Sequence, residues 1–195
     1  HPDFFRYCQD LLDYYRDDKR VMMISGDNFQ AGTRRGEYSY YFSRYVHIWG
    51  WATWRSAWKL YDVDLKSWPQ VRHENALDYV YTGKREKKFW EKTIDEVYSK
   101  LIDTWDYQWI FTCWGQHGLV VVPQVNLISN IGFNVEATHT QGTSELSNLP
   151  IEEIKFPLEH PSLICPNILA DRYTYLNVFN PPVWKRLLTK LRMRL

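Results

Sequence analysis

The chain has 195 residues, 45% of them hydrophobic, so it can bury one sizeable core and is not a disordered chain. Its 24 basic and 23 acidic residues leave a formal charge of +1, which gives no overall field to attract nucleic acid or an acidic partner. Three widely separated cysteines show neither paired nor metal-type spacing, and no apolar run approaches the roughly 20 residues of a membrane span. We therefore expect a protein of a reducing compartment, the cytoplasm, with no nucleic-acid partner.

The first predicted elements are a helix and a buried strand. Apolar residues recur at helical spacing up to Tyr15, which predicts an amphipathic helix ending near residues 17–18. The apolar run at 21–24 then stops at a glycine, as a buried parallel strand does. Because ligands bind at the carboxyl ends of such strands, Asp27 and Asn28 are candidate substrate-binding residues. The plainer alternative for this pair is an Asx turn.

The remaining predicted elements alternate between strands and helices. They are, in chain order, a strand over 38–46, a short helix over 54–60, an irregular stretch over 62–84, a helix over 88–102, a helix with Thr104 as N-cap that ends near Gly115 or Gly118, and a buried strand over 119–123. This order predicts an α/β fold.

The composition changes beyond Thr140 to Gly, Ser, Pro, Glu and isolated apolar residues, which predicts a tail or lid outside the core. The last segment, residues 184–195, starts at Trp184 and ends at Leu195, and it carries several lysines and arginines without one acid. Its apolar residues share one helical face, a pattern that fits peripheral contact with a membrane. An ordinary solvated terminal helix is the alternative.

Nine of the ten tryptophans fall between Trp49 and Trp114, several of them in two short strings at 49–54 and 104–109. A core needs only a few such rings, so the excess predicts a wall that binds a ligand. Flat rings with one polar edge suit the apolar C–H faces and hydroxyls of a sugar, although a buried aromatic cluster is the alternative. The candidate substrate-binding residues of the two strings are Trp49, Gly50, Trp51, Trp54, Trp105 and Trp109.

Asp106 is the first candidate for a catalytic residue. It falls at the start of a predicted helix, where backbone N–H groups and the macrodipole favour an ionised carboxylate. Such a carboxylate can accept a proton from an attacking hydroxyl. The alternative is an acid that only stabilises its helix. His139, which follows a glycine-bearing loop, is a candidate metal ligand, with a solvated loop histidine as the alternative.

A set of short segments resembles the GT-A-fold glycosyltransferases, in particular bacterial proteins of the family 2 type that look related to the animal N-acetylglucosaminyltransferase I group. The resemblance covers residues 1–142 and depends on the order and spacing of the segments together. In chain order they are Pro2-Asp3-Phe4-Phe5, Ile24-Ser25-Gly26-Asp27-Asn28, Gly50-Trp51-Ala52-Thr53-Trp54, Trp105-Asp106, Pro123, Asn130-Ile131-Gly132 and Thr138-His139.

The resemblance implies that residues 1–142 form the acceptor side of a GT-A domain with a Rossmann-like mixed sheet, followed by an irregular and helical extension over 143–195. The nucleotide-binding part, with the main acidic ligand of a Mn²⁺ or Mg²⁺ ion, is expected upstream of His1, so the chain by itself is expected to have little activity. His139 would lie in the loop that closes over the donor. Trp51 and Trp54 would line one sugar pocket.

The implied chemistry is an inverting displacement in bacterial polysaccharide biosynthesis. Asp106, with Asp103 as its nearest rival, would deprotonate a hydroxyl of a glycan or lipid-linked acceptor. That hydroxyl would attack a nucleotide-diphospho-sugar donor of the hexosyl or N-acetylhexosaminyl type. Two other functions stay open: a non-catalytic carbohydrate-binding or degenerate transferase module, and an interaction fragment held at the inner face of the membrane by its basic end.

Overall fold

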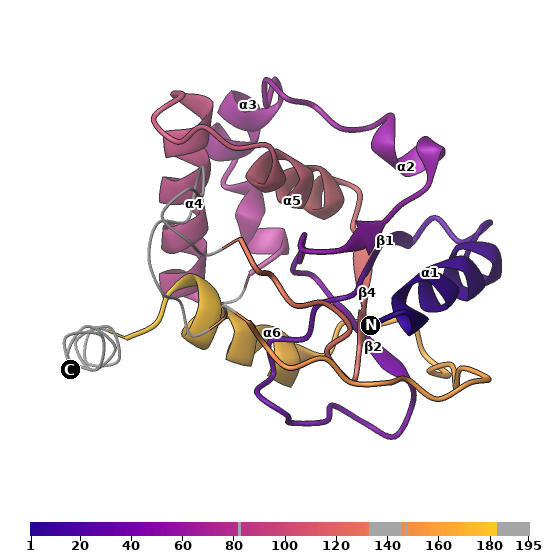
Figure 1. Ribbon diagram of the computed structural model, residues 1–195. Coiled ribbons are helices and arrows are strands. Elements are labelled where there is room, and N and C mark those ends of the chain that lie inside the picture. The colour runs from indigo at the N-terminus through magenta and orange to yellow at the C-terminus, as the bar shows by residue number, and fades with distance from the viewer. Residues whose placement is uncertain (82, 133–145, 147, 183–195) are drawn as a thin grey trace.

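The fold is described here from a computed structural model, for residues 1–81, 83–132, 146 and 148–182. Its centre is a four-stranded mixed sheet with strand order β2-β4-β1-β3 (Figure 1). The two central strands β1 and β4 are parallel, and each has an antiparallel neighbour at the edge. The strands are β1 Val21–Ser25, β2 Tyr40–Ser43, β3 Trp51–Ala52 and β4 Leu119–Pro123. The chain therefore has helices packed on a mixed sheet, as an α/β fold does.

The two apolar runs form the predicted buried strands. Every residue of β1 and of β4 is buried, because helices cover both faces of this central pair. Side chains of successive strand residues point to opposite faces, so Met23 and Val120 join one core cluster while Ile24 and Val121 join the other. Figure 1 shows α1 on one side of the sheet, with α4 and α5 on the other.

The helices surround this sheet. They are α1 Asp3–Tyr14, α2 Arg55–Trp58, α3 Trp68–His73, α4 Lys84–Tyr98, α5 Asp106–Gly115 and α6 Ile168–Thr174, with single turns η1 Ala76–Tyr79 and η2 Tyr175–Phe179. The prediction that 62–84 is irregular was wrong for α3 and η1. Pro69 does not prevent a helix here, because it lies in the first turn of α3, where proline is tolerated. The buried Trp68 and Leu77 fix both elements to the core.

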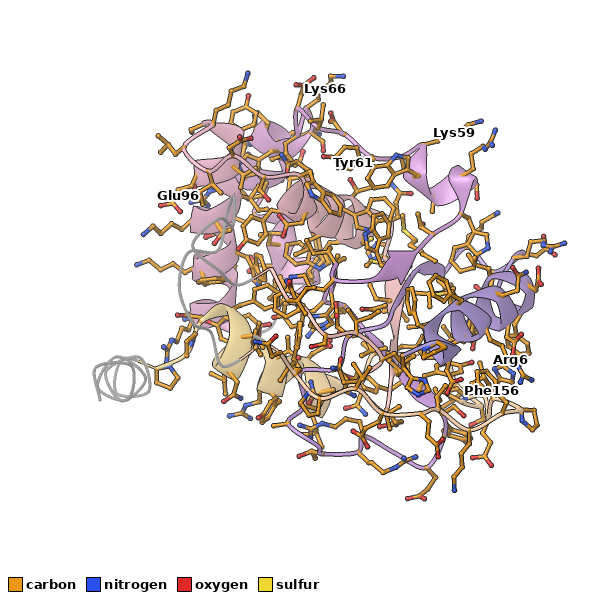
Figure 2. The ribbon with its side chains drawn as sticks, viewed as in Figure 1. Arg6, Lys59, Tyr61, Lys66, Glu96 and Phe156 are labelled. Carbon is orange, nitrogen blue, oxygen red and sulfur yellow. The ribbon has the colours of Figure 1, made fainter. Side chains whose placement is uncertain are left out.

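The prediction that the chain beyond Thr140 lies outside the core was also wrong. Ile154 and Leu158 belong to the cluster under α1, and Ala170 and Tyr175 belong to the cluster under α4 and α5. In Figure 2 Arg6 of α1 and Phe156 lie together, and the guanidinium carbon is 4.0 Å from the centre of the phenyl ring. Isolated apolar residues without a period gave no sign of this packing in the sequence.

An ion pair with a buried carboxylate also fixes α6 to the sheet. Asp171 is fully buried, and its carboxylate accepts hydrogen bonds from the hydroxyl of Ser43 at 2.6 Å and from Nε of Arg44 at 3.0 Å. Across the described residues, no helix is both long and apolar enough to cross a membrane. The basic segment 184–195 lies outside the described residues, so its predicted membrane contact stays a prediction.

Candidate functional site

Asp106 is the first residue of α5, and one of its carboxylate oxygens is held in place. Oδ1 accepts a hydrogen bond from the hydroxyl of Thr104 and another from the backbone N–H of Tyr107 at 3.0 Å. The predicted N-cap, Thr104, was wrong: Trp105 occupies this position because the helix begins at Asp106, and the Thr104 hydroxyl bonds the Asp106 side chain. Among the described residues, none donates a hydrogen bond to Oδ2 of Asp106. The carboxylate is thus oriented by one oxygen and leaves the other open.

Two phenol side chains lie near this carboxylate. Burial raises the pKa of Tyr61, and the negative charge of Asp106 raises it further. The pKa of Tyr107 is raised in the same way, first by burial and then by Asp106. The Tyr61 hydroxyl donates a hydrogen bond to the carbonyl of Trp105 at 3.2 Å. The segment after α2, where Figure 2 labels Tyr61, therefore supports the backbone that leads into Asp106.

An aromatic cluster borders Asp106; it consists of Trp51, Trp58, Tyr61, Trp105 and Trp109. The rings of Trp51 and Trp105 are stacked, with centres 5.6 Å apart and planes 24° apart. The rings of Trp58 and Tyr61 are stacked at 4.6 Å and 6°. Trp105 is 40% exposed and Trp58 is 38% exposed, so the cluster presents aromatic surface to solvent beside the carboxylate.

The structure thus brings Trp51, Trp105 and Trp109 together with Asp106, although they come from distant parts of the sequence. Trp109 is fully buried and its indole N–H contacts the sulfur of Met23, so it supports the cluster from below and offers no surface to a ligand. Sequence reasoning missed Trp58 and Tyr61. Their spacing of three residues, which places two side chains on one helical face, was the available signal.

Trp54 does not join the aromatic cluster. Its indole N–H donates a hydrogen bond to the carbonyl of Leu12 in α1 at 3.0 Å, and its ring packs with the core cluster on the α1 side of the sheet. It lines a separate cavity of about 290 Å³ with Tyr15 and Met22. The prediction that Trp51 and Trp54 line one pocket was therefore wrong, because the chain passes from β3 into α2 between them and the two rings face different sides.

Asp27 lies fully buried at the carboxyl end of β1. Its Oδ2 accepts a hydrogen bond from the backbone N–H of Trp49 at 2.8 Å, while Oδ1 has no hydrogen-bond partner among the residues that the structure describes. Burial raises the pKa of Asp27 to about 7, and the bond from Trp49 opposes this rise. The ring of Trp49 meets Phe29 edge to face at 5.1 Å. In this structure Asp27 positions the tryptophan-rich segment.

Gly50 allows two backbone segments to approach closely. Its φ of +136° is in the region that favours glycine, and a Cβ atom there would lie 2.5 Å from the side chain of Ile128. Its carbonyl accepts the N–H of Gly26 at 2.8 Å, which extends the pairing of β1 with β3. Packing of the chain thus requires glycine at this position.

Asn28 connects the ends of the two parallel strands. Its Nδ2 donates a hydrogen bond to the carbonyl of Pro123 at 2.6 Å, and its Oδ1 accepts the N–H of Gln30 at 2.8 Å. The second bond is the Asx turn that was the plainer alternative for this residue. Asn28 also lines a cavity of about 330 Å³ at the carboxyl ends of β1 and β4.

The predicted Mn²⁺ or Mg²⁺ site depends on His139 and on residues expected upstream of His1, so it stays a prediction. Within the described ranges, no three His, Cys, Asp or Glu side chains come close enough together to hold a metal ion. His139 lies outside the described residues, and its role as a ligand stays a prediction.

Comparisons with family models, with curated proteins and with solved structures found no match. The functional assignment therefore depends on the chemistry of the residues themselves. Asp106 and Trp105 lie next to each other and form the candidate site. The carboxylate of Asp106 is held by one oxygen, and the ring of Trp105 is exposed to solvent.

Proposed function

We propose that the chain carries the acceptor side of an inverting glycosyltransferase of the GT-A type, with Asp106 as the general base. The observation that carries this proposal is the carboxylate of Asp106, which has one anchored and one open oxygen beside the exposed ring of Trp105. A general base must be oriented and must keep one lone pair for the proton that it accepts. The resemblance described above supports the same role for this residue.

The reaction is a single displacement. As the acceptor hydroxyl oxygen forms its bond to the anomeric carbon of a nucleotide-diphospho-sugar, its proton passes to Oδ2 of Asp106. The bond from the anomeric carbon to the diphosphate oxygen breaks, and the electron pair leaves on the diphosphate. Because attack comes from the face opposite the leaving group, the configuration at that carbon inverts.

The aromatic cluster supplies the orientation that this step needs. One face of Trp105 stacks on Trp51, and the exposed part of its ring can contact the C–H face of a sugar. Such a contact holds the acceptor hydroxyl near the carboxylate and reduces the entropy lost in the transition state. The acceptor is therefore a glycan or a glycan carried on a lipid.

The test is to measure turnover and acceptor binding separately in the natural protein. We expect Asp106→Asn to lower the rate of sugar transfer by about 10²- to 10⁴-fold, because this is the usual contribution of a general base, and to leave acceptor affinity unchanged. Trp105→Ala should weaken acceptor binding. If acceptor binds at the aromatic cluster but Asp106→Asn transfers sugar as fast as the wild type, or neither protein transfers sugar, the chain is a non-catalytic carbohydrate-binding module.

A further inference from the structure

The short segment that leads into Asp106 is held by side chains on both of its carbonyl groups. The carbonyl of Thr104 accepts a hydrogen bond from Nε2 of Gln108 at 2.6 Å. The carbonyl of Trp105 accepts one from the Tyr61 hydroxyl at 3.2 Å. Thr104 and Trp105 both precede α5, which begins at Asp106. Gln108, from inside the helix, thus fixes backbone that lies outside it.

Gln108 is a buried polar residue with a definite orientation. It is 5% exposed and lies beside the buried Trp109 and Ile110. Because only the nitrogen of a glutamine amide can donate, the bond to Thr104 directs Nε2 at that carbonyl and turns Oε1 away from it. Oε1 is buried and has no hydrogen-bond partner among the described residues, which costs free energy. A methionine would fill this space without that cost, so the bond to Thr104 is what glutamine adds here.

Thr104 passes this constraint on to the carboxylate. Its hydroxyl donates a hydrogen bond to Oδ1 of Asp106, the oxygen that also accepts the backbone N–H of Tyr107. Because threonine is branched at Cβ and has few rotamers, the position of its backbone largely determines the position of its hydroxyl. Gln108, Thr104 and Asp106 therefore form one connected series of hydrogen bonds. It ends at Oδ1, and fixing Oδ1 also fixes the direction of Oδ2, because the carboxylate is rigid and planar.

We propose that Gln108 is a positioning residue for the base. Through Thr104 it holds the Asp106 carboxylate in the orientation that presents Oδ2 to the acceptor hydroxyl. Gln108 is buried and does not touch the acceptor, so its loss should slow the transfer step and leave acceptor binding unchanged. This inference deepens the proposed function and rests on it for the role in transfer, while the hydrogen bonds themselves can be tested without a substrate.

The first test is amide hydrogen exchange of Tyr107, measured by NMR on the natural protein. Tyr107 lies in the first turn of α5, where a backbone N–H has no acceptor inside the helix, and its N–H is held by Oδ1 of Asp106. We expect Gln108→Met, which removes Nε2 and keeps the side-chain length, to speed this exchange by about tenfold, the usual effect of one lost hydrogen bond. Thr104→Val should give at least this increase, and Thr104→Ser, which keeps the hydroxyl, a smaller one.

Thr93→Val is the matched control. Thr93 is a buried polar residue of α4, and its hydroxyl also donates to the carbonyl four residues earlier, that of Phe89, at 3.0 Å. This variant loses the same kind of bond away from Asp106, so the exchange of Tyr107 should stay at the wild-type rate. The proposal fails if exchange rises equally in Thr93→Val, or if it is unchanged in Gln108→Met. If Gln108→Met does not fold, Gln108→Glu takes its place, because it keeps the shape and its ionised carboxylate cannot donate.

The second test is a double-variant cycle in sugar transfer, with UDP-N-acetylglucosamine and UDP-glucose as donors and octyl β-D-glucoside as the acceptor. Gln108→Met should lower kcat by about tenfold and leave the KM for the acceptor near the wild-type value. In a Thr104→Val protein the same change should have little further effect, because both act through one hydroxyl. Additive losses, or a raised KM with unchanged kcat, would overturn the positioning role.

The two proposals fail separately. If Asp106→Asn transfers sugar as fast as the wild type, the proposed function fails whatever the exchange of Tyr107 shows. If Asp106→Asn is inactive and Gln108→Met has the wild-type kcat, only the positioning role fails. If the wild type transfers sugar from neither donor, the exchange of Tyr107 alone decides whether Gln108 holds the carboxylate.

Discussion

The carboxylate of Asp27 accepts the backbone N–H of Trp49 at 2.8 Å, and this bond ties the carboxyl end of β1 to the segment that leads into β3. In the same pair of strands Ser25 lies opposite Trp51, which is a member of the aromatic cluster. The hydrogen bond from Trp49 to the buried carboxylate of Asp27 thus helps to place Trp51, two residues further on, beside Trp105.

The first prediction concerns Asp27 and pH. Its pKa is raised to about 7 by burial, from 3.8, so the folded state binds more protons than the unfolded state between these values. The free energy of unfolding is therefore highest below the pKa of the unfolded state, and it falls as the pH rises through the folded-state pKa of about 7. Asp27→Asn should remove this loss, which amounts to about 4 kcal/mol for the whole shift. Urea unfolding of both proteins from about pH 4 to about pH 8 measures it; parallel curves for the two proteins would contradict the prediction.

His47 should show the opposite dependence. It is fully buried, and burial lowers its pKa from 6.5 to about 3, so the unfolded state binds more protons between these values. Stability should therefore fall as pH drops from about 6.5 toward about 3. His47→Gln does not titrate, and its unfolding free energy should lose about 5 kcal/mol less than the wild type over this range. Urea unfolding of both proteins from about pH 7 down to about pH 3 measures the difference, and an equal loss in both proteins would refute it.

The sequence alone predicts the central strands well, because β1 and β4 are continuous apolar runs that end at glycine or proline. It also predicts that Asp106 starts a helix near a tryptophan. It does not predict that Trp51 and Trp54 lie on opposite sides of the sheet, because their positions depend on how the chain turns from β3 into α2. Nor does it predict the burial of Asp171, because the pairing with Arg44 is a tertiary contact between segments far apart in the chain.

Gly50 provides a prediction about packing. Gly50→Ala adds a Cβ atom 2.5 Å from Ile128 and forces alanine to a φ of +136°, so it should lower the free energy of unfolding by roughly 2 to 4 kcal/mol. The double variant Gly50→Ala, Ile128→Ala removes the clash and not the backbone strain. The two changes should therefore be non-additive in chemical denaturation. Simple additivity would mean that the Ile128 side chain moves aside at little cost.

The ion pair that fixes α6 gives a fourth prediction. Asp171→Ala leaves the guanidinium of Arg44 without its carboxylate partner and should cost about 3 to 5 kcal/mol in the free energy of unfolding. Asp171→Asn keeps an acceptor for Ser43 and should cost less. Hydrogen exchange should increase first in α6, which the pair holds to the sheet. An Asp171→Ala protein of wild-type stability would show that other contacts suffice.

The central claim is that Asp106, and not its neighbour Asp103, is the general base. The most direct measurement is the rate of sugar transfer at saturating acceptor for Asp106→Asn and for Asp103→Asn, the latter changing an exposed acid three residues earlier. We predict a loss of at least about 100-fold for Asp106→Asn and a rate close to wild type for Asp103→Asn. Full activity of Asp106→Asn, or a loss found only in Asp103→Asn, would contradict the account.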